Sequence, residues 1–362
     1  MFRPCVSEHA IRRVTEVLRS GWVGEGPRVA ELEERLAPRL GVRPVAVNSG
    51  TSALHLALRL AGVGPGDEVV TTAQTMLATS QAILAVGALP VYADIQYATG
   101  NLDPASAAAA VTERTRAILA VDWAGYPCDW DELREVARRH GLATVDDAAH
   151  ALGARYRDRP VGTVADHTCF SLQAVKHLTT GDGGLLCCLA DADRRRARAL
   201  RWFGIDRETR LPSILGEAEF EVRELGYKYQ MNDVAAAIGL GNLEELDTWT
   251  ERRRQLARRY RDTLGSVAGL TLFERGADRV SAEWLFSVHV ERRRDFCAAL
   301  AGRGVEVSVV HSRIDRHPIC GGLRPGLEAL ERFDRTHICL PLHSGLSDVQ
   351  HAHVVASVRA GW

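Results

Sequence analysis

Residues 170–184 read FSLQAVKHLTTGDGG and place one lysine, Lys176, in a short loop between two apolar segments. These segments, near His167–Leu172 and Leu185–Leu189, are short and bounded by glycine or polar residues, which predicts two core strands. Partial removal of this lysine from water lowers its pKa toward the range in which an amine can form an imine. The nearby glycines let a flat ligand approach the backbone closely. A lone lysine in a loop is usually solvated and has no special function, so a functional role for Lys176 depends on the residues around it.

Outward from this loop, predicted strands and helices alternate through most of the chain. The alternation predicts an α/β fold whose central sheet is mainly parallel and covered by helices on both faces. The predicted strands include Pro44–Val47, Glu68–Thr72, Leu89–Ala93, Ala117–Asp122 and Leu142–Asp146, and the predicted helices include Glu8–Ser20, Val29–Leu40, Ser52–Ala61, Met76–Val86 and Trp130–His140.

The pattern changes near Leu246. A long charged helix, Glu251–Leu264, is followed by shorter strands and helices, and the chain ends in a predicted helix over Ser347–Arg359. We therefore expect a large α/β domain over residues 1–245 and a smaller α+β domain over residues 246–362.

The composition is that of an ordinary globular protein, because 46 % of the 362 residues are hydrophobic and 25 % are charged. A net charge of −1 creates no overall field that would favour nucleic acid or an anionic membrane. Apolar runs such as Ala107–Val111 fall far short of the roughly 20 residues that span a bilayer. Three arginine runs, at residues 194–196, 252–254 and 292–294, have acidic neighbours and are interpreted as solvated helix faces.

The eight cysteines include no metal-type CxxC pair. Together with the lack of a recognisable signal peptide, this predicts reduced thiols and a cytoplasmic location. Cys187 and Cys188 lie in an apolar run and are predicted strand residues. His351 and His353 are two residues apart on a predicted helix and so lie on different faces, which argues against a metal site.

A first candidate binding feature is residues 48–53, which follow a predicted strand and open a helix. Backbone N–H groups and hydroxyls, including those of Thr51 and Ser52, would face outward there with the helix dipole behind them, which suits a phosphate. The alternative is a plain helix N-cap formed by Ser49 or Thr51.

A second feature is the pair Asp146–Asp147 at the end of a predicted strand, followed by His150. Two buried carboxylates are costly unless something uses them, and only one can face a given pocket. An acid beneath a pyridine nitrogen keeps that nitrogen protonated, although a carboxylate that caps a turn is an equal alternative. The phosphate site, the acid and Lys176 all follow predicted strands, where open α/β sheets bind ligands.

Taken together, these motifs resemble the sugar-aminotransferase family typified by DegT and StrS, which are fold type I enzymes that use pyridoxal phosphate (PLP). The resemblance covers nearly the whole chain. It is carried by Ser20–Trp22 with Gly26–Pro27, Asn48–Leu54, Gly64–Val69, Gly87–Val91 with Asp94, Asp147–His150 with Gly153–Ala154, Phe170–Ser171 with Lys176 and Gly183–Gly184, and Gly226–Asp233 with Ala235–Ala237.

The resemblance implies a role for each matching residue. Lys176 is the Schiff-base lysine and shuttles a proton, and Asp147 pairs with the pyridine nitrogen. His150 lies near the ring. The phosphate is held by Thr51, Ser52 and Ser171.

Two positions depart from the usual pattern of this family. Met76 stands where relatives commonly have an aromatic side chain stacked on the ring, and its thioether can pack on an aromatic face. Lys228 stands where many relatives have an asparagine that reaches the phosphate of the neighbouring subunit, and a lysine also binds phosphate. The resemblance therefore implies a homodimer with Lys228 at the partner's site.

The implied reaction moves an amino group from glutamate, or glutamine, to a keto-sugar nucleotide, with an NDP-4-keto-6-deoxyhexose aminated at C4 preferred. A 3-keto sugar or an aminocyclitol ketone remains open as the acceptor. A sugar dehydratase is a second alternative, since some relatives have histidine in place of the lysine. The spacing from Ser171 favours Lys176 over His177 at that position. The third alternative is a non-catalytic regulatory module of the same fold.

Substrate contacts are assigned more loosely. His311, Arg313 and His317 form a polar loop cluster in the smaller domain, which is either solvated surface or a contact with the sugar or its diphosphate. Trp22 and Glu25 are further substrate-side candidates.

Overall fold

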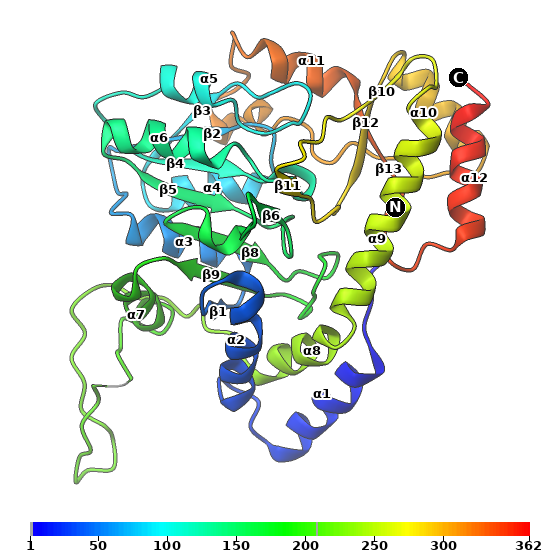
Figure 1. Ribbon diagram of the computed structural model, residues 1–362. Helices are drawn as coiled ribbons and strands as arrows, with labels where there is room; N and C mark the ends of the chain where they lie inside the picture. Colours follow the sequence, from blue (N-terminus) through cyan, green and yellow to red (C-terminus); the bar gives the residue numbers. More distant parts are fainter. Residues whose placement is uncertain (1–2, 208) are drawn as a thin grey trace.

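The computed structural model describes residues 3–207 and 209–362. Its centre is a seven-stranded sheet of order β1-β9-β8-β5-β4-β2-β3 (Figure 1). The strand β9 is antiparallel to both neighbours, and the other six strands run in one direction. The strands are β1 (Val45–Val47), β2 (Glu68–Thr72), β3 (Leu89–Ala93), β4 (Thr115–Val121), β5 (Ala143–Asp147), β8 (His167–Ser171) and β9 (Gly184–Cys188).

Helices cover both faces of this sheet and bury one apolar cluster on each face. One face packs against α2 (Pro27–Leu40), α5 (Pro104–Ala109), α6 (Trp130–His140) and α8 (Asp233–Leu243). The other face packs against α3 (Gly50–Leu60), α4 (Leu77–Ala85) and α7 (Asp191–Leu200). Burial on both faces explains why the strands are apolar throughout rather than alternating.

The N-terminal helix α1 (Glu8–Ser20) lies outside this sandwich and crosses α8. The backbones approach closely at Gly241, where a Cβ would lie 2.2 Å from the backbone nitrogen of Ala10. Ser7 fixes the crossing, because its hydroxyl donates to the carbonyl of Gly241 and its backbone N–H donates to the side chain of Asn242.

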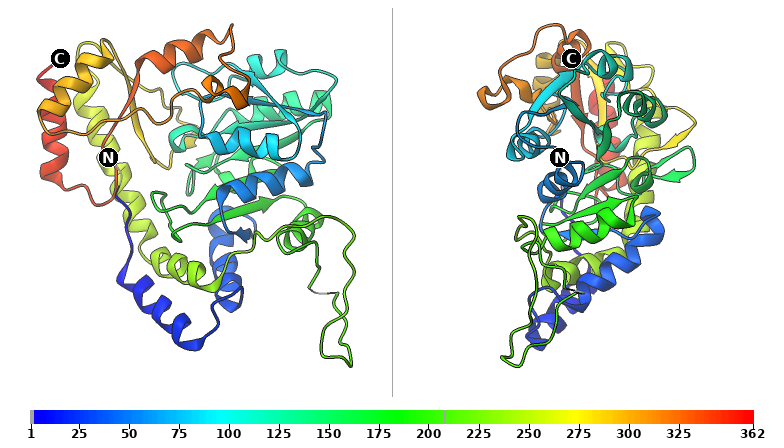
Figure 2. Two further views of the ribbon diagram at one scale, coloured as in Figure 1. Left: turned by 180° about the vertical axis from the view of Figure 1, so that it is seen from behind. Right: turned by 90° about the vertical axis from the view of Figure 1, so that its left-hand side faces the viewer.

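A smaller antiparallel sheet of order β10-β12-β13 follows the long helix α9 (Leu246–Leu264). It consists of β10 (Leu270–Leu272), β12 (Phe286–Val290) and β13 (His337–Leu340) and shares an apolar core with α9, α10 (Arg293–Gly302) and α12 (Asp348–Arg359). The helix α11 (Glu328–Thr336) packs nearer the large sheet, and the C-terminus lies beside α10 and α12 (Figure 2). The division at residues 245/246 falls between α8 and α9, and we keep it as a proposal.

Short elements complete the fold. In a third sheet of order β11-β6-β7, the central strand β6 (Arg155–Tyr156) pairs with β11 (Arg279–Val280) on one side and with β7 (Arg159–Pro160) on the other. Four 3₁₀ turns lie at Trp123–Gly125, Val161–Thr163, Ile314–Arg316 and Pro318–Cys320.

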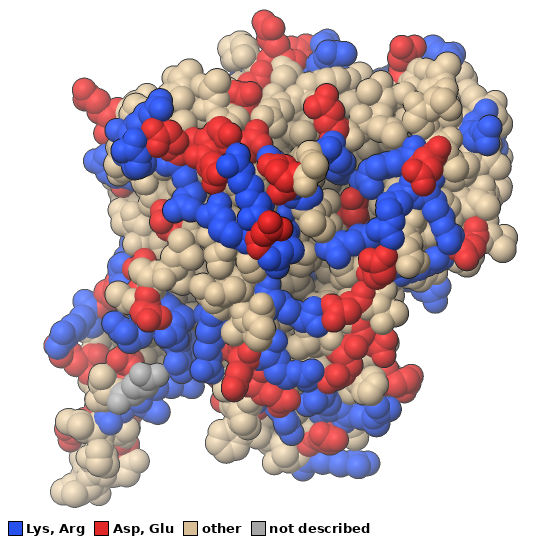
Figure 3. Space-filling model, viewed as in Figure 1, with Lys and Arg blue, Asp and Glu red and all other residues tan. Residues whose placement is uncertain are grey.

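Between α7 and α8, residues 203–207 and 209–227 leave the body as a long arm (Figures 1 and 2). Bridges between Ile205 and Val222 and between Leu211 and Glu219 hold its two sides together. In Figure 3, the tip of this arm is largely free of charged side chains, whereas acidic and basic side chains intermingle over the rest of that face. No pattern in the sequence predicts this arm.

The predicted fold class is confirmed, since a mainly parallel sheet is covered on both faces by helices. One surface interpretation is wrong. The side chain of Arg253 in α9 is buried, because its guanidinium donates to the carbonyls of Trp284 and Leu342 instead of facing water. Among residues 3–207 and 209–362, no helix is long and apolar enough to cross a membrane.

Candidate active site

A cavity of about 450 Å³ opens where three parallel strands of the large sheet end. Val121 ends β4, Asp147 ends β5 and Ser171 ends β8, and all three line the cavity. The start of α3 contributes Gly50 and Thr51. The cavity also includes Ser49, Thr75, Met76, His150, Gln173, Lys176, Trp284 and His311.

The amine of Lys176 has the properties of a reactive lysine. Burial lowers its pKa to about 7, and the negative charge of Asp147 opposes this decrease only in part. Its Nζ atom lies 3.8 Å from the ring centroid of Trp284. Near neutral pH, an amine with this pKa is populated in both its protonated and its neutral form, so it can donate and accept protons.

Asp147 is held in a fixed orientation at the other side of the cavity. Its Oδ2 accepts a hydrogen bond of 2.7 Å from the hydroxyl of Thr79, and its Oδ1 accepts one of 3.3 Å from the backbone of Ala149. Burial raises the pKa of this carboxyl, and a cationic partner would stabilise its ionised form. Asp146 has the opposite orientation, as the strand geometry predicts, and does not line the cavity.

A candidate phosphate cradle lies at the N-terminus of α3. The hydroxyl of Ser49 caps the helix by accepting from the backbone N–H of Ser52, so the cap that we considered as an alternative exists within the cradle. Gly50 keeps it open, because a Cβ there would lie 3.0 Å from the Cβ of Ser171. The side chain of Ser52 donates to Asn48 over 2.6 Å and lies behind the cradle rather than on the cavity wall.

Three further predicted residues line the cavity. Met76 is half exposed and stands at the N-cap of α4. His150 stacks on Trp284 with ring centroids 3.7 Å apart, and burial holds its pKa well below the usual range. His311 is not solvated surface, since it faces the cavity and burial lowers its pKa to about 4.

The other predicted residues lie outside this cavity. Lys228 is exposed, with its amine 4.5 Å from the ring centroid of Trp202 at the base of the arm. Trp22 is exposed beside Gly26, and Glu25 pairs with Arg201 over 2.7 Å.

The polar loop cluster is divided in the same way. Arg313 is 6 % exposed and forms a two-bond ion pair with Asp315, so the interpretation of solvated surface is wrong for this residue. His317 is exposed and lies away from the cavity. Of this cluster, only His311 is placed to meet a substrate in the cavity of its own chain.

Sequence reasoning missed Trp284 and Thr79. Thr79 lies one helical turn after Met76, and that spacing could have pointed to it. Trp284 is a single tryptophan just before β12, more than 100 residues from Lys176, so its contact with the lysine depends on the tertiary fold.

The residues present fit pyridoxal phosphate. The helix N-terminus with Thr51 and Ser171 suits its phosphate, Asp147 suits its ring nitrogen and Lys176 suits its carbonyl carbon. The Nδ1 atom of His150 is buried and has no hydrogen-bond partner among the described residues, which leaves a polar group for a ligand.

Comparison with known proteins agrees with this site. The chain is 39 % identical over 277 residues to the UDP-4-amino-4-deoxy-L-arabinose–oxoglutarate aminotransferase of Shewanella sediminis. The aligned region covers 74 % of this chain and 70 % of that protein. It is similar to the sugar aminotransferase CalS13 of Micromonospora echinospora, with a TM-score of 0.95, 37 % identity, and coverage of 100 % of this chain and 99 % of that chain.

Another similar structure is the putative sugar aminotransferase Spr1654 of Streptococcus pneumoniae, solved in PLP and PMP forms. It has a TM-score of 0.91 and 30 % identity, and it covers 99 % of this chain and at least 96 % of that chain. The model of the DegT/DnrJ/EryC1/StrS aminotransferase family matches residues 4–359. The chain therefore belongs to this family of pyridoxal-phosphate-dependent aminotransferases.

Proposed function

We propose that this aminotransferase moves an amino group from glutamate, or glutamine, to a keto-sugar nucleotide, and that the acceptor is an NDP-4-keto-6-deoxyhexose aminated at C4. The observation that carries the proposal is the amine of Lys176, whose pKa burial lowers to about 7 within a cavity shared with Asp147 and Ser171. The relative named for UDP-4-amino-4-deoxy-L-arabinose and oxoglutarate supports a nucleotide-linked sugar, the C4 position and glutamate as donor.

The bound cofactor supplies a carbonyl that condenses with amines and a ring that accepts electrons from the carbon that loses its proton. With the cofactor bound, Lys176 would be the group that accepts and returns the transferred proton, a role that suits an amine with a pKa of about 7. Asp147, oriented by Thr79, keeps the ring nitrogen protonated.

The remaining cavity residues bind and orient. Thr51 and Ser171 hold the phosphate, and Ser52 supports them through the cap of α3. Met76 lines the cavity at the position where relatives have an aromatic side chain, and it would cover the ring. His150, stacked on Trp284, would lie beside the ring, and His311 would be free to meet the substrate.

Lys176 and His177 distinguish amino transfer from the dehydratase alternative. Lys176 lines the cavity, whereas His177 is buried outside it and donates from Nε2 to the carbonyl of Ala282 over 2.8 Å. A lysine in this place favours transfer of an amino group. A 3-keto sugar or an aminocyclitol ketone stays as an alternative acceptor, and a non-catalytic module is disfavoured by the intact site.

The test begins with the reconstituted protein. Borohydride should attach the cofactor covalently to Lys176, as read from the mass of the labelled peptide. Glutamate should then yield 2-oxoglutarate in a single turnover, and a 4-keto sugar nucleotide should be converted to the 4-amino sugar. The variant Lys176→Ala should make no product. Release of ammonia with a deoxy-keto sugar would instead identify a dehydratase, and failure to react with glutamate or glutamine would contradict amino transfer.

We further propose that the active unit is a homodimer in which Lys228 reaches the phosphate at the partner's site. Lys228 does not line the cavity of its own chain, and it stands at the base of the arm, where several apolar side chains are exposed. Lys176 and Lys228 are the only two lysines among the 45 lysines and arginines of the chain. Because arginine fills almost every other cationic position, the lysine at position 228 supports a specific role for this residue. A cytoplasmic location stays a prediction from the sequence.

A further inference from the structure

We propose that Trp284 is a positioning residue of the reaction, which holds the amine of Lys176 and the imidazole of His150 in place for proton transfer. The inference rests on the proposed function of Lys176 as the proton-transferring lysine. Trp284 comes from the segment before β12, and no motif around the lysine predicts it.

The contacts of Trp284 are specific. The Nζ atom of Lys176 lies 3.8 Å from the ring centroid, well within the reach of a cation–π interaction. The imidazole of His150 stacks on the same indole with an interplanar angle of 14°. Trp284 is 2 % exposed, and such interactions are strongest where water is excluded.

The orientation of the indole is fixed from two sides. Its Nε1 donates over 3.1 Å to the carbonyl of Val175, the residue next to the lysine. Its backbone N–H donates over 3.0 Å to the carbonyl of Ala124. Trp284 is therefore tied both to the loop that carries Lys176 and to the turn that follows β4.

The backbone on both sides of this contact adopts an uncommon conformation. Glu283, which precedes Trp284, has φ +54°. Ala124, whose carbonyl accepts the backbone N–H of Trp284, has φ +57°. Non-glycine residues in the left-handed region are held there by their surroundings and gather at functional sites. The uncommon backbone thus coincides with the placement of one side chain in the cavity.

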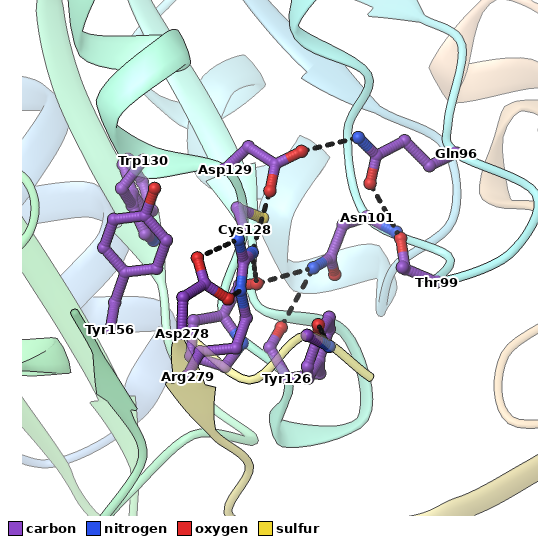
Figure 4. Close-up of polar contacts among 12 residues, drawn as sticks. Gln96, Thr99, Asn101, Tyr126, Cys128, Asp129, Trp130, Tyr156, Asp278 and Arg279 are labelled. Atoms are coloured by element: carbon purple, nitrogen blue, oxygen red, sulfur yellow. Dashed lines mark hydrogen bonds and ion pairs between the residues drawn. The ribbon is translucent and has the colours of Figure 1, made fainter. Parts of the chain in front are cut away.

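A polar network anchors the segment that precedes Trp284 in the chain (Figure 4). Arg279 pairs with Asp129 over 2.8 Å and donates to the carbonyl of Pro127 over 2.9 Å. Gly276 donates its backbone N–H to the hydroxyl of Tyr126, and Ala282 donates to the carbonyl of Gly125. Such outer support is what keeps an active-site side chain at its required distance.

The indole has a defined chemical effect on the lysine. Burial favours the neutral amine, whereas the face of the indole favours the ammonium form, so Trp284 keeps the proton-donating state of Lys176 populated near neutral pH. The same ring restricts where the amine can lie, and small errors in position cost rate in proton transfer. Removal of the indole should therefore change both the titration and the catalytic rate.

The first test uses the folded apoprotein and reads Lys176 directly. Competitive acetylation of its amine is followed across pH by peptide mass spectrometry, with a short lysine-containing peptide added to each sample as the solvated reference. Trp284→Met fills the space without an aromatic face and should move the titration midpoint of Lys176 down by roughly 0.4–1.5 pH units. Trp284→Phe, whose ring is a weaker partner, should give a smaller downward shift. The matched control Trp362→Leu, which removes a tryptophan packed on Phe296, should give none.

An unchanged or raised midpoint in Trp284→Met would overturn the proposal. If that variant does not fold, as judged by circular dichroism, the decision rests on Trp284→Phe, for which an unchanged midpoint is equally decisive. In the reconstituted enzyme, Trp284→Phe should lower kcat several-fold while leaving KM for the amino donor nearly unchanged. If Lys176→Ala keeps full activity, the proposed function itself fails, whereas an essential Lys176 with an unshifted titration refutes only the inference about Trp284.

Discussion

At the scale of single residues, two opposing effects set the pKa of the Lys176 amine. Burial lowers the pKa of Lys176 to about 7, and the carboxylate of Asp147 raises it. In the unfolded chain the same amine is solvated and remains protonated to about pH 10. The folded protein therefore loses stability at neutral pH to obtain an amine that can exchange protons there.

This balance predicts that Lys176→Met stabilises the apoprotein. Between pH 7 and about 10 the unfolded chain binds a proton that the folded chain lacks, so the stability of the wild type rises with pH in this window. Below pH 7 the full penalty remains. Removal of the amine should raise the free energy of unfolding at pH 7 by roughly 1–3 kcal/mol, less than the full pKa shift implies because the side chain is only partly buried.

Urea unfolding of both apoproteins at pH 7 and at pH 9.5 measures this effect. The gain should shrink at the higher pH, because the stability of the wild type rises with pH in this window. A loss of stability in Lys176→Met at pH 7, or a gain that grows with pH, would show that the pKa of Lys176 is not lowered.

Single residues were predictable from sequence where a local motif places them. Lys176, Asp147 and Ser171 all follow strand ends, so the topology of a parallel sheet brings them together once the strands are known. Trp284 could not be predicted in this way, because its contact with Lys176 depends on a turn in a distant segment. Arg313 was misread because an arginine in a loop carries no sign of a nearby buried aspartate.

At the scale of elements, periodicity located most strands and helices of the large domain. It could not reveal the direction of β9, since an apolar strand reads the same whether it pairs parallel or antiparallel. Nor could it reveal the arm, whose apolar residues lack a regular period. Arg253 was expected on a solvated helix face, but its guanidinium is buried and donates to two backbone carbonyls. The position of these carbonyls depends on the tertiary fold, so the sequence pattern does not show it.

The helix α2 illustrates how a distant residue completes an element. Gly26 stands at its N-cap and has no side chain, and the carboxylate of Asp233 takes over the cap. It accepts from the backbone N–H groups of Gly26, Arg28 and Val29 over 2.9–3.2 Å. Its negative charge also lies at the positive end of the helix dipole.

We therefore predict that Asp233→Ala lowers the free energy of unfolding by roughly 2–3 kcal/mol, because three backbone donors lose a buried charged acceptor. Asp233→Asn should lose about half as much, since one oxygen remains. Urea unfolding followed by circular dichroism measures both. Asp191→Ala removes an exposed acid from the first turn of α7 and should change stability by less than about 0.5 kcal/mol. Equal stability of Asp233→Ala and Asp191→Ala would contradict this account of the cap.

At the scale of the whole molecule, the arm is the feature that a single chain does not explain. Several exposed apolar side chains gather on it, with Ile214 fully exposed and Leu215 87 % exposed. Contiguous exposed apolar side chains mark an interaction surface. Cover by a second copy of the chain would bury these side chains and bring Lys228, at the base of the arm, toward a neighbouring cavity.

The proposed homodimer predicts that two inactive variants restore each other. In Lys176→Ala the amine is missing, and in Lys228→Ala the partner's phosphate contact is missing. In a mixed dimer, one site combines an intact Lys176 with an intact Lys228 from the other chain, whereas the second site lacks both. Random exchange of subunits in a two-fold dimer should therefore return up to about a quarter of the wild-type activity.

The measurement is turnover after the two variants are mixed under conditions that allow exchange, with sedimentation velocity to follow the dimer. Ile214→Glu with Leu215→Glu should dissociate the dimer and abolish this recovery, because a charge in an apolar contact is costly to desolvate. Val349→Glu, at an exposed position in α12, is the matched control and should change neither. A mixture that stays inactive while exchanging freely would show that each chain holds a complete site, because only a site shared between subunits can be rebuilt from two defective chains.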